Sequence, residues 1–541
     1  MKDISSTGSF VDFTLENFIY VDKTVYIPQL VKLKRVFISR PRRFGKSLTL
    51  DTIATLFETG VEPYFKGTWI YDKWTEPTYP VLRLNFLNFD KNTLEKFNNK
   101  LNSKITEFAE LNQVTTYKEK EEAEDSIDHL LEQLRLEGRQ IVILIDEYDC
   151  QMTANINNET LYKQFQEKIK SFYANIKDKF AIKFLGITGV TRLKDVSIFS
   201  VGSDINDITN ASAYSQMIGF TRDEIKKYYI DYLKLASSYE NNCSVDDVTD
   251  TQLESMLDMM AQNYDGYCFD EDYEKKVFST WSVNKFFQTM IEKKKVQFGE
   301  YWYDNGGLPS ILVNYLKTHE LNIFEYLDKD KFLKVSSDDF KNPTALTTIN
   351  QNVLMCQTGY LTLRSDLNKT STVALGIPNG EIYKALNRLL ANNIFKGNTD
   401  ITDDYGRSLL EVGTVDDIIN LFNSALNSVS YDNYPIVTES SVQNMLKLYL
   451  LGAHQEVLSE VHEAKCRADL VVNTDNRRIV FEFKYAKNEA EAKSKLSEAV
   501  EQIKTRDYGN ILPKKNELIR IAAVFNADPK VRAFTENQIV P

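Results

Sequence analysis

The feature that most constrains this chain is a strand, a short loop and a helix close to its N-terminus. The apolar run Val36–Ser39 predicts a buried strand, and Leu48–Phe57 predicts a helix. The loop between them reads Ser39-Arg40-Pro41-Arg42-Arg43-Phe44-Gly45-Lys46-Ser47. In such a loop the N–H groups at the helix start cradle an anion, a lysine reaches the outer phosphates and a serine ligates Mg²⁺. The pattern therefore predicts a phosphate-binding loop, whose contacts come from Arg42, Arg43, Phe44, Gly45, Lys46 and Ser47.

A second apolar strand supplies the acids that a nucleotide site needs. The run Ile141–Ile145 is followed directly by Asp146 and Glu147. An aspartate at the end of a buried strand can hold Mg²⁺, and an adjacent glutamate can orient the attacking water. A Gly-Lys-Ser tripeptide alone is weak evidence, since a helix-capping turn can look the same. The two halves together predict the site.

A third strand end adds a polar side chain to this predicted site. Thr188 follows the strand expected at Ile182–Ile187, and it is our candidate to lie near the γ-phosphate. Arg192, four residues later, either contacts phosphate or bridges to an acid on the surface. The arginines of the loop present the same choice between phosphate and a carboxylate partner.

The order of apolar runs predicts an α/β protein built from several domains. Strands at Val36–Ser39, Val81–Phe86, Ile141–Ile145 and Ile182–Ile187 alternate with helical stretches such as Tyr117–Leu136, which predicts a parallel sheet covered on both faces. The stretch from Phe220 to Leu390 is mostly helical. After Val429 the pattern is helix Ser440–Leu451, strands Glu456–Glu460, Ala468–Val472 and Ile479–Lys484, helix Glu489–Thr505 and strand Leu518–Phe525. We therefore predict three regions, residues 1–216, 217–428 and 429–541.

Composition places few limits on function. The chain of 541 residues is 43% hydrophobic and 26% charged, with a formal net charge of −12, which argues weakly against a protein that coats nucleic acid. No apolar run approaches the roughly 20 residues that cross a bilayer, and no secretory signal is visible. The five cysteines form no Cys-x-x-Cys pair, and the four histidines share no metal-ligand spacing. We expect a cytoplasmic protein that has no membrane partner.

The last region carries the pattern of a metal-dependent nuclease. Glu482 and Lys484 are two residues apart on a predicted strand, so their side chains share a face, and Asp469 precedes them at hairpin distance. Asp469 and Glu482, with the carbonyl of Phe483, can hold Mg²⁺, while Lys484 orients or deprotonates a water. Alternating Glu and Lys usually marks a solvated face. The apolar neighbours predict a buried strand instead, where charges need partners or metal.

These motifs resemble the predicted AAA-ATPase-like family whose members carry a C-terminal PD-(D/E)XK nuclease domain. The matching segments lie along almost the whole chain: Tyr20-Val21-Asp22-Lys23-Thr24, the loop Arg40 to Ser47, Ile145-Asp146-Glu147-Tyr148-Asp149, Gly219-Phe220-Thr221, Tyr264-Asp265-Gly266-Tyr267, Trp281-Ser282-Val283, Thr358-Gly359-Tyr360-Leu361-Thr362 and Ile377-Pro378-Asn379. The resemblance implies an N-terminal P-loop NTPase of the ASCE/AAA-like type, a mainly helical middle and a C-terminal restriction-endonuclease-like α/β domain. It implies ATP and Mg²⁺ as cofactors and nucleic acid, with DNA expected, as partner.

The resemblance also suggests roles for single residues. Arg40 stands where a regular phosphate loop has glycine, but the family's own loop carries arginine there. Tyr20 to Thr24 are expected near the base or ribose, where Tyr20 stacks or merely packs. In the nuclease superfamily a helix acid often joins the metal, which favours Glu439 over Glu460. Gln502 and Tyr508 resemble a helix motif that lies beside such sites.

The leading hypothesis is an ATP-binding, hydrolysing protein coupled to a Mg²⁺-dependent nuclease. Its nucleotide state would reposition the helical middle and gate the C-terminal site. Two alternatives remain open. One is a nucleotide-dependent sensor or scaffold whose nuclease-like domain binds nucleic acid without cutting it. The other is an effector or toxin nuclease. A homo-oligomer is compatible with any of them.

Overall fold

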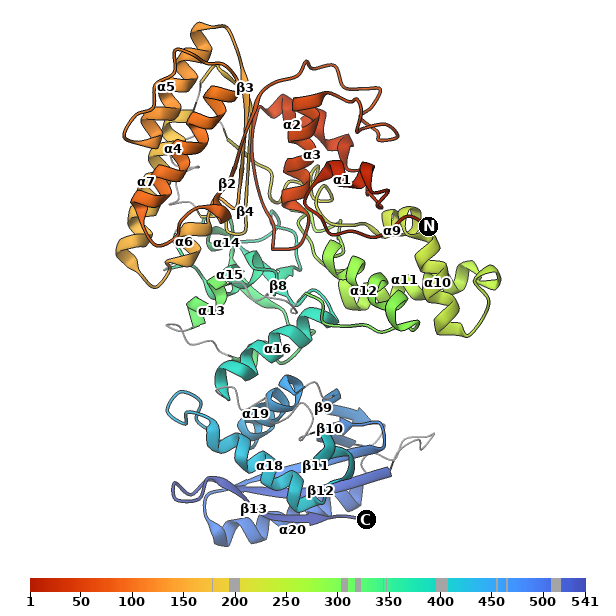
Figure 1. Ribbon diagram of the computed structural model, residues 1–541. Helices are drawn as coiled ribbons and strands as arrows, with labels where there is room; N and C mark the ends of the chain where they lie inside the picture. The colour runs from red at the N-terminus through yellow and green to blue at the C-terminus, as the bar shows by residue number, and fades with distance from the viewer. Residues whose placement is uncertain are drawn as a thin grey trace. The chain divides into compact units, whose positions relative to one another are not determined.

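The computed structural model describes residues 1–177, 179–193, 205–302, 310–316, 323–343, 345–346, 348–395, 407–453, 456–463, 466–506 and 517–541. These residues form two compact units (Figure 1). The first contains Met1–Leu321 and Asp330–Ile382, and the second contains Asn322–Lys329 and Tyr383–Pro541. The division into three regions made from the sequence stays a prediction.

The first unit is built on a parallel sheet of five strands. Their order is β2-β3-β4-β1-β5, so β4 lies between β1 and β3. The bounds are β1 Arg35–Ser39, β2 Val81–Asn85, β3 Ile141–Asp146, β4 Ile182–Gly189 and β5 Asn206–Asp207. Every residue of β3 is buried, as expected for a central parallel strand. The sheet confirms the predicted α/β fold of the P-loop type.

Helices cover both faces of this sheet. In Figure 1 α1 (Phe10–Leu15), α2 (Ile27–Leu33) and α3 (Lys46–Thr59) lie on one side of the strands, and α4 (Leu94–Leu111), α5 (Ala123–Leu136) and α7 (Glu159–Ile176) lie on the other. The short helix α6 (Cys150–Ala154) follows β3. Because parallel strands run the same way, the loops after β1, β3 and β4 meet at one edge of the sheet.

The helix expected at Tyr117–Leu136 begins only at Ala123, as α5, and this part of the prediction is wrong. Side chains of α4 hold the preceding backbone out of a helix. The amide of Asn102 donates to the carbonyls of Lys120 and Glu121, at 3.0 and 3.1 Å. The carbonyl of Asn98 accepts from the N–H of Ala123 at 2.9 Å. These contacts come from another helix, so helical periodicity could not reveal them.

The rest of the first unit, within residues 217–382, is called the middle region here. It has a helical core from α9 (Arg222–Tyr228), α10 (Ile230–Asn241), α11 (Asp250–Tyr264) and α12 (Thr280–Lys293). It continues with α13 (Ser310–Leu316), α14 (Ser337–Lys341) and α15 (Gln351–Gln357). The region also holds a small antiparallel sheet, β6 (Leu333–Ser336), β8 (Thr372–Gly376) and β7 (Thr362–Leu363), which the sequence did not predict. These strands have two to five residues, too few for a clear alternation.

The second unit contains a mixed sheet in the order β13-β12-β11-β10-β9. Its strands are β9 Glu456–Glu463, β10 Cys466–Asn473, β11 Arg477–Ala486, β12 Glu517–Asn526 and β13 Ala533–Ile539. Only β11 and β12 pair in parallel, and α20 (Glu489–Arg506) connects them. The predicted order from helix to strand Leu518–Phe525 is confirmed, with α19 at Glu439–Gly452. The sequence analysis did not predict the polar strand β13, or the packing of helix α18 (Val415–Ser428) against it.

Two further helices follow along the chain. They are α16 (Gly380–Ile394), which begins at the end of the middle region, and α17 (Arg407–Val412). Among the described residues, none of the helices has the length and apolar character needed to pass through a membrane.

Gly189, the last residue of β4, lies where no side chain fits. A Cβ atom added there would be 2.6 Å from Cε1 of Tyr148 and 2.8 Å from Oδ1 of Asp149. Both neighbours are buried, so neither can move into solvent. This close approach lets the segment after β3 pack against the end of β4, and it explains the glycine.

We expect Gly189→Ala to lower the free energy of unfolding of the first unit by about 1–3 kcal/mol, because overpacking a rigid core forces its neighbours to shift. Chemical denaturation of both proteins measures the difference. Gly8→Ala is the matched control, since nothing lies within 4 Å of its added Cβ. Equal stability of the two variants would contradict this account of Gly189.

Candidate functional site

The loop after β1 turns through a glycine that the backbone requires. Gly45 has φ of 101°, a conformation that residues with a Cβ rarely adopt, and α3 begins at the next residue. No side chain caps this helix N-terminus. An uncapped start of a 14-residue helix leaves N–H groups and the positive end of the helix dipole available to an anion.

Lys46 lies against its own loop. Its ammonium donates to the carbonyls of Arg40 and Pro41, at 3.1 and 3.2 Å, and lies 3.4 Å from Oε1 of Glu147. The side chain is buried. The structure thus brings together the lysine of the loop and the glutamate after β3, as the sequence predicted for a joint site.

The carboxylate of Asp146 connects the other two strand ends. Its Oδ2 accepts from Oγ of Ser47 at 2.6 Å, and its Oδ1 accepts from the hydroxyl of Thr188 and from the N–H of Glu147. Both Asp146 and Thr188 are buried. The first turn of α3 and the ends of β3 and β4 therefore form one hydrogen-bonded cluster at one edge of the sheet.

Asp149 is a residue that the sequence analysis quoted but gave no role. Its carboxylate accepts from the N–H groups of Val190 and Thr191, at 3.3 and 2.6 Å, and from the hydroxyl of Thr191 at 2.6 Å. Burial, and then the charge of Glu147, raises the pKa of Asp149. Asp149 thus holds the segment after Thr188 in place. Its spacing of three residues from Asp146 was the available signal.

Arg192, for which two roles were open, forms an ion pair with Asp207 of β5. Its N–H also donates to the side chain of Gln357, at 3.2 Å. This geometry corresponds to the second alternative, a bridge to an acid.

Three residues of the loop, Arg40, Arg43 and Phe44, contact other groups of the protein. Arg40 is buried: it donates to the carbonyls of Ser39 and Thr209, at 2.9 and 2.5 Å, and its guanidinium lies 4.1 Å from the centre of the Phe269 ring. Burial lowers the pKa of Arg40 to about 9. The expected choice between phosphate and a carboxylate does not describe this residue, which contacts carbonyls and a ring.

Arg43 and Phe44 also contact the middle region. One nitrogen of Arg43, Nη1, donates to the carbonyls of Tyr301 and Trp302, at 2.9 and 3.0 Å. Its guanidinium lies 4.6 Å from the centre of the Trp281 ring. The ring of Phe44 is buried, 4.7 Å from that of Tyr267. Of the three loop arginines, only Arg42 has a side chain without a hydrogen bond, ion pair or ring contact to the described residues.

The carbonyls that hold Arg43 belong to a segment fixed by a buried acid. Oε1 of Glu381 accepts from the N–H of Trp302 at 2.7 Å, and Oε2 accepts from Oγ of Ser282 at 2.6 Å. Burial raises the pKa of Glu381 to about 8, although these donors favour its charged form. The loop, the segment at Trp302 and the start of α16 are therefore linked by hydrogen bonds within one unit.

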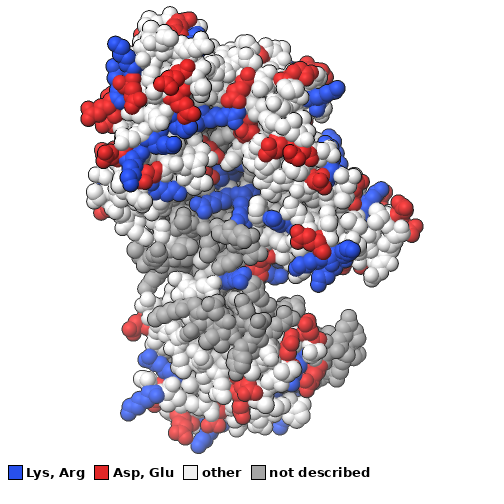
Figure 2. Space-filling model, in the orientation of Figure 1, with Lys and Arg blue, Asp and Glu red and all other residues white. Residues whose placement is uncertain are grey.

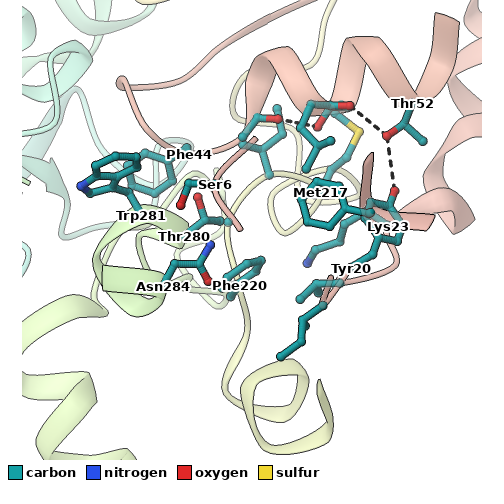
Figure 3. Close-up of a pocket in the computed structure, with 18 of the residues that line it drawn as sticks. Ser6, Tyr20, Lys23, Phe44, Thr52, Met217, Phe220, Thr280, Trp281 and Asn284 are labelled. Atoms are coloured by element: carbon teal, nitrogen blue, oxygen red, sulfur yellow. Dashed lines mark hydrogen bonds between the residues drawn. The ribbon is translucent and has the colours of Figure 1, made fainter. Parts of the chain in front are cut away.

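A cavity of about 150 Å³ opens beside the loop (Figure 3). Its lining includes Gly45 and Thr49 at the start of α3, Tyr20 and Lys23 from the preceding segment, and Trp281 of α12. Figure 3 labels Tyr20, Lys23 and Trp281 among the side chains that line it. The lining is mostly apolar, and the ammonium of Lys23 is already paired with Glu224 at 2.6 Å. The ring of Tyr20 packs edge-on against Phe10 and Phe13, at centroid distances of 4.9 and 5.6 Å.

In the second unit, the predicted nuclease residues lie on neighbouring strands. Leu470 of β10 pairs with Phe481 of β11, so Asp469 and Glu482 are close in register. Oδ2 of Asp469 accepts from the N–H of Phe483 at 2.8 Å. Glu482 is fully buried and Lys484 almost so. The prediction of a buried strand with two charged residues is confirmed.

Lys484 is the centre of this cluster. Its ammonium lies 2.8 Å from Oε1 of Glu482, 3.1 Å from the carbonyl of Phe483 and 3.4 Å from Oε1 of Glu439. Burial alone would lower the pKa of Lys484, but Glu482, Glu439 and Asp469 together raise it. Burial raises the pKa of Asp469, against the effects of the Phe483 N–H and Lys484.

The donor atoms suit a hard cation, but the ammonium lies among them. Carboxylate and carbonyl oxygens are the ligands that Mg²⁺ prefers, and Asp469, Glu439, Glu482 and Phe483 supply them. The ammonium of Lys484 contacts three of these atoms, which are Oε1 of Glu482, the carbonyl of Phe483 and Oε1 of Glu439. In the part of the chain that the structure describes, no three His, Cys, Asp or Glu side chains are grouped to hold a metal ion.

Gln443 is a residue of this cluster that the sequence analysis missed. It lies one helical turn after Glu439 on α19, and its side chain is close enough to Asp469 to oppose the rise in the pKa of that carboxyl. The spacing of four residues from Glu439 was the available signal. The side chains of Glu460 and His462, and the residues His454 and Tyr508, lie outside the described parts, and Gln502 is on α20.

Comparison with known families agrees with this geometry. Residues 5–199 match the model of a family described as predicted AAA-ATPase. Residues 437–535 match the model of the PD-(D/E)XK nuclease superfamily. The first match contains the loop, the acids after β3 and Thr188. The second contains Glu439, Asp469, Glu482 and Lys484.

The chain is also similar to single proteins. It is 26% identical over 533 residues to a protein of Azotobacter chroococcum named as an uncharacterized protein in the vnfD 5′ region, and the match covers 95% of this chain and 94% of that one. Among solved structures, Cdc6p from Pyrobaculum aerophilum matches 68% of this chain and 91% of its own, at 10% identity and a TM-score of 0.21. At this TM-score the match supports no conclusion about this chain.

The buried Glu381 predicts a pH-dependent stability. In the folded protein the pKa of Glu381 is above its ordinary value of 4.5, so the folded state binds the proton of this carboxyl more tightly than the unfolded state does. The stabilisation is complete below about pH 4.5 and is lost as the pH rises through about 8. We expect the free energy of unfolding to fall less between about pH 4.5 and about pH 8 in Glu381→Gln than in the wild type, by on the order of a few kcal/mol. Chemical denaturation at both pH values measures the difference.

The matched control for this comparison is Glu292→Gln, an exposed glutamate of α12. It should keep the pH dependence of the wild type. If Glu381→Gln loses stability over the window as the wild type does, Glu381 is not the group responsible.

Proposed function

Since the chain joins an AAA-ATPase-like domain to a domain of the PD-(D/E)XK nuclease superfamily, we propose that it is an ATP-controlled, Mg²⁺-dependent nuclease acting on nucleic acid, with DNA as the first candidate. The observation that carries the proposal is the convergence of Glu439, Asp469 and Glu482 on the buried ammonium of Lys484. Glu482 and Lys484 are buried, and buried charges are costly unless they are paired or bound to a metal ion.

Each side chain of the C-terminal cluster has a role in this proposal. Asp469 and Glu482, with Glu439 and the carbonyl of Phe483, would hold Mg²⁺. Bound there, the ion would supply Lewis-acid chemistry, lowering the pKa of a water and offsetting charge on the phosphate. Lys484 would orient the attacking water. Gln443, whose side chain favours the charged form of Asp469, would help to position that carboxylate.

The N-terminal cluster would bind the triphosphate of ATP. The first turn of α3 and Lys46 would contact phosphate, and Ser47 with Asp146 would hold the associated Mg²⁺. Glu147 would orient water for hydrolysis, and Thr188 would keep Asp146 in place. Arg42, the loop arginine without a protein partner among the described residues, is the best placed to add a charge-assisted contact.

The cavity beside the loop supports a site for the base. Its volume of about 150 Å³ equals that of an apolar cavity known to take one aromatic ring, so it suits a base and not a whole nucleotide. Tyr20 and Trp281 supply ring surface, and Gly45 places the cavity next to the phosphate loop. This arrangement favours the expected role of Tyr20 to Thr24.

Coupling between nucleotide and nuclease would start at Arg43. A ligand bound at the loop would favour a loop conformation in which Arg43 no longer donates to the carbonyls of Tyr301 and Trp302. Glu381 fixes Trp302, and it precedes Ile382, the last residue of the first unit. A shift between two arrangements of this segment is how we propose the nucleotide state reaches the second unit.

One observation favours the sensor or scaffold alternative. The ammonium of Lys484 pairs with Glu482 and so competes with a metal ion for that carboxylate, and no three-acid metal group is formed among the described residues. In that function the second unit would bind nucleic acid without cutting it. Cleavage by the purified protein separates the two.

We expect Glu482→Gln to abolish Mg²⁺-dependent cleavage, by at least about a hundredfold, because it removes a charged ligand while keeping the side chain's size. Conversion of supercoiled plasmid to nicked and linear forms measures it. Glu489→Gln on α20, where the side chain is 78% exposed, is the matched control and should cut normally. Cutting by Glu482→Gln at the wild-type rate would refute the assigned nuclease site.

For Lys46→Ala we expect ATP binding to weaken at least tenfold, and cleavage no longer to respond to ATP, because the phosphates lose their lysine. Fluorescent ATP binding and the plasmid assay with and without ATP measure both effects. Lys163→Ala, an exposed lysine of α7, is the control. The gating proposal is wrong if Lys46→Ala responds to ATP as the wild type does.

A further inference from the structure

A second and larger cavity lies at the opposite edge of the N-terminal sheet. This groove has a volume of about 680 Å³, and its lining includes Arg35 at the start of β1 and Ile182 at the start of β4. The phosphate loop follows the other end of β1, and Thr188 lies near the other end of β4. Five residues of β1 separate the two edges, or roughly 17 Å at the usual rise of a strand. The groove is therefore a site separate from the nucleotide cluster.

The groove is strongly basic. Six cationic residues line it: Lys32, Lys34, Arg35, Lys73, Lys179 and Lys183. The lining contains one carboxylate, Glu76. This excess stands out because the whole chain has a formal net charge of −12. Figure 2 shows how acidic and basic side chains are interspersed over one face of the molecule. A local excess of this size focuses positive potential in a concave site.

Only part of this charge is neutralised by carboxylates. Lys183 pairs with Glu76 at 2.6 Å, and Lys179 pairs with Asp128 outside the groove. Lys32, Lys34 and Lys73 form no ion pair with any residue that the structure describes, and all three are exposed. The ammonium of Lys73 donates to the carbonyl of Trp69 at 3.0 Å. The partial negative charge at the C-terminal ends of helices α2 and α7 favours lysines at those ends. Lys73 and Lys183 lie on neither helix, so this effect does not explain their presence.

Two aromatic residues lie among these cations. The side chain of Phe180 is 67% exposed, which is unusual for an aromatic residue beside lysines. Trp74 also lines the groove, and its indole N–H has no hydrogen-bond partner within the described residues. A cationic groove with an exposed ring is the arrangement that binds a phosphate backbone while bases stack on the ring.

We propose that this groove binds single-stranded nucleic acid through its sugar–phosphate backbone, with a base stacked on Phe180. The inference rests on the proposed function, which gives the chain a nucleic-acid substrate. An acidic polypeptide would match the charges equally well, but it would make no use of the exposed ring. The groove would hold the strand on the N-terminal unit, separate from the chemistry at Lys484.

The test measures binding of the full chain to a fluorescent oligothymidine of roughly 20 nucleotides, by anisotropy, in EDTA and without nucleotide. We expect Lys32→Ala/Lys34→Ala/Lys73→Ala to bind at least about tenfold more weakly. Three lost phosphate contacts should also lower the slope of log affinity against log salt by about 2. Phe180→Ala should weaken binding to the single strand more than to a duplex.

The matched control replaces three exposed lysines elsewhere on the same unit, Lys96, Lys100 and Lys118, by alanine. It changes net charge equally, so it should leave affinity and salt slope near the wild type. The proposal is overturned if the wild type does not bind the strand, if both triple variants lose affinity equally, or if only poly-glutamate binding depends on the groove. Cleavage in Mg²⁺ is measured separately. A protein that binds through the groove without cutting refutes the nuclease proposal and supports the groove.

Discussion

The carboxylate of Asp146 is the contact on which the N-terminal site depends. It accepts hydrogen bonds from Ser47 in the first turn of α3 and from Thr188 near the end of β4, while Asp146 itself is the last residue of β3. Three chain segments far apart in sequence are thus held at one point of the sheet edge. The arrangement is possible because β4 lies between β1 and β3, so their carboxyl ends are neighbours. A buried carboxylate with these partners makes the position of each strand end depend on the others.

In the second unit a buried carboxylate also depends on its neighbours, but here the main partner is an ammonium group. Glu482 lies on a fully buried stretch of β11, where an unpaired carboxylate would be strongly destabilising. Lys484, on the same face of the strand, supplies the compensating charge at 2.8 Å. Glu439 and Asp469 add to the negative charge around this ammonium. Lys484 forms ion pairs with Glu482 and Glu439, and the same carboxylate oxygens have the chemistry of a metal site.

Much of both sites could be predicted from the sequence, because their chemistry is carried by residues at strand ends. The buried run before Asp146 and the Glu-x-Lys alternation on β11 placed the charged residues correctly relative to the sheet. The roles of the loop residues were harder to predict. A charge pattern suggests that Arg40 and Arg43 meet anions, whereas Arg40 packs on Phe269 and Arg43 on Trp281. Their partners are distant in sequence, and a local pattern contains no information about them.

The sequence by itself determined the strand–loop–helix of the phosphate loop, the acids after β3, and the alternation that puts Glu482 and Lys484 on one face. These features depend on local periodicity and backbone preference. Only the tertiary structure decided that α5 begins at Ala123, that the middle region packs against Arg40 and Arg43, and that lysines from separate segments surround one groove. Each of these results from side chains that meet across the fold, where packing and burial, and not local preference, set the free energy.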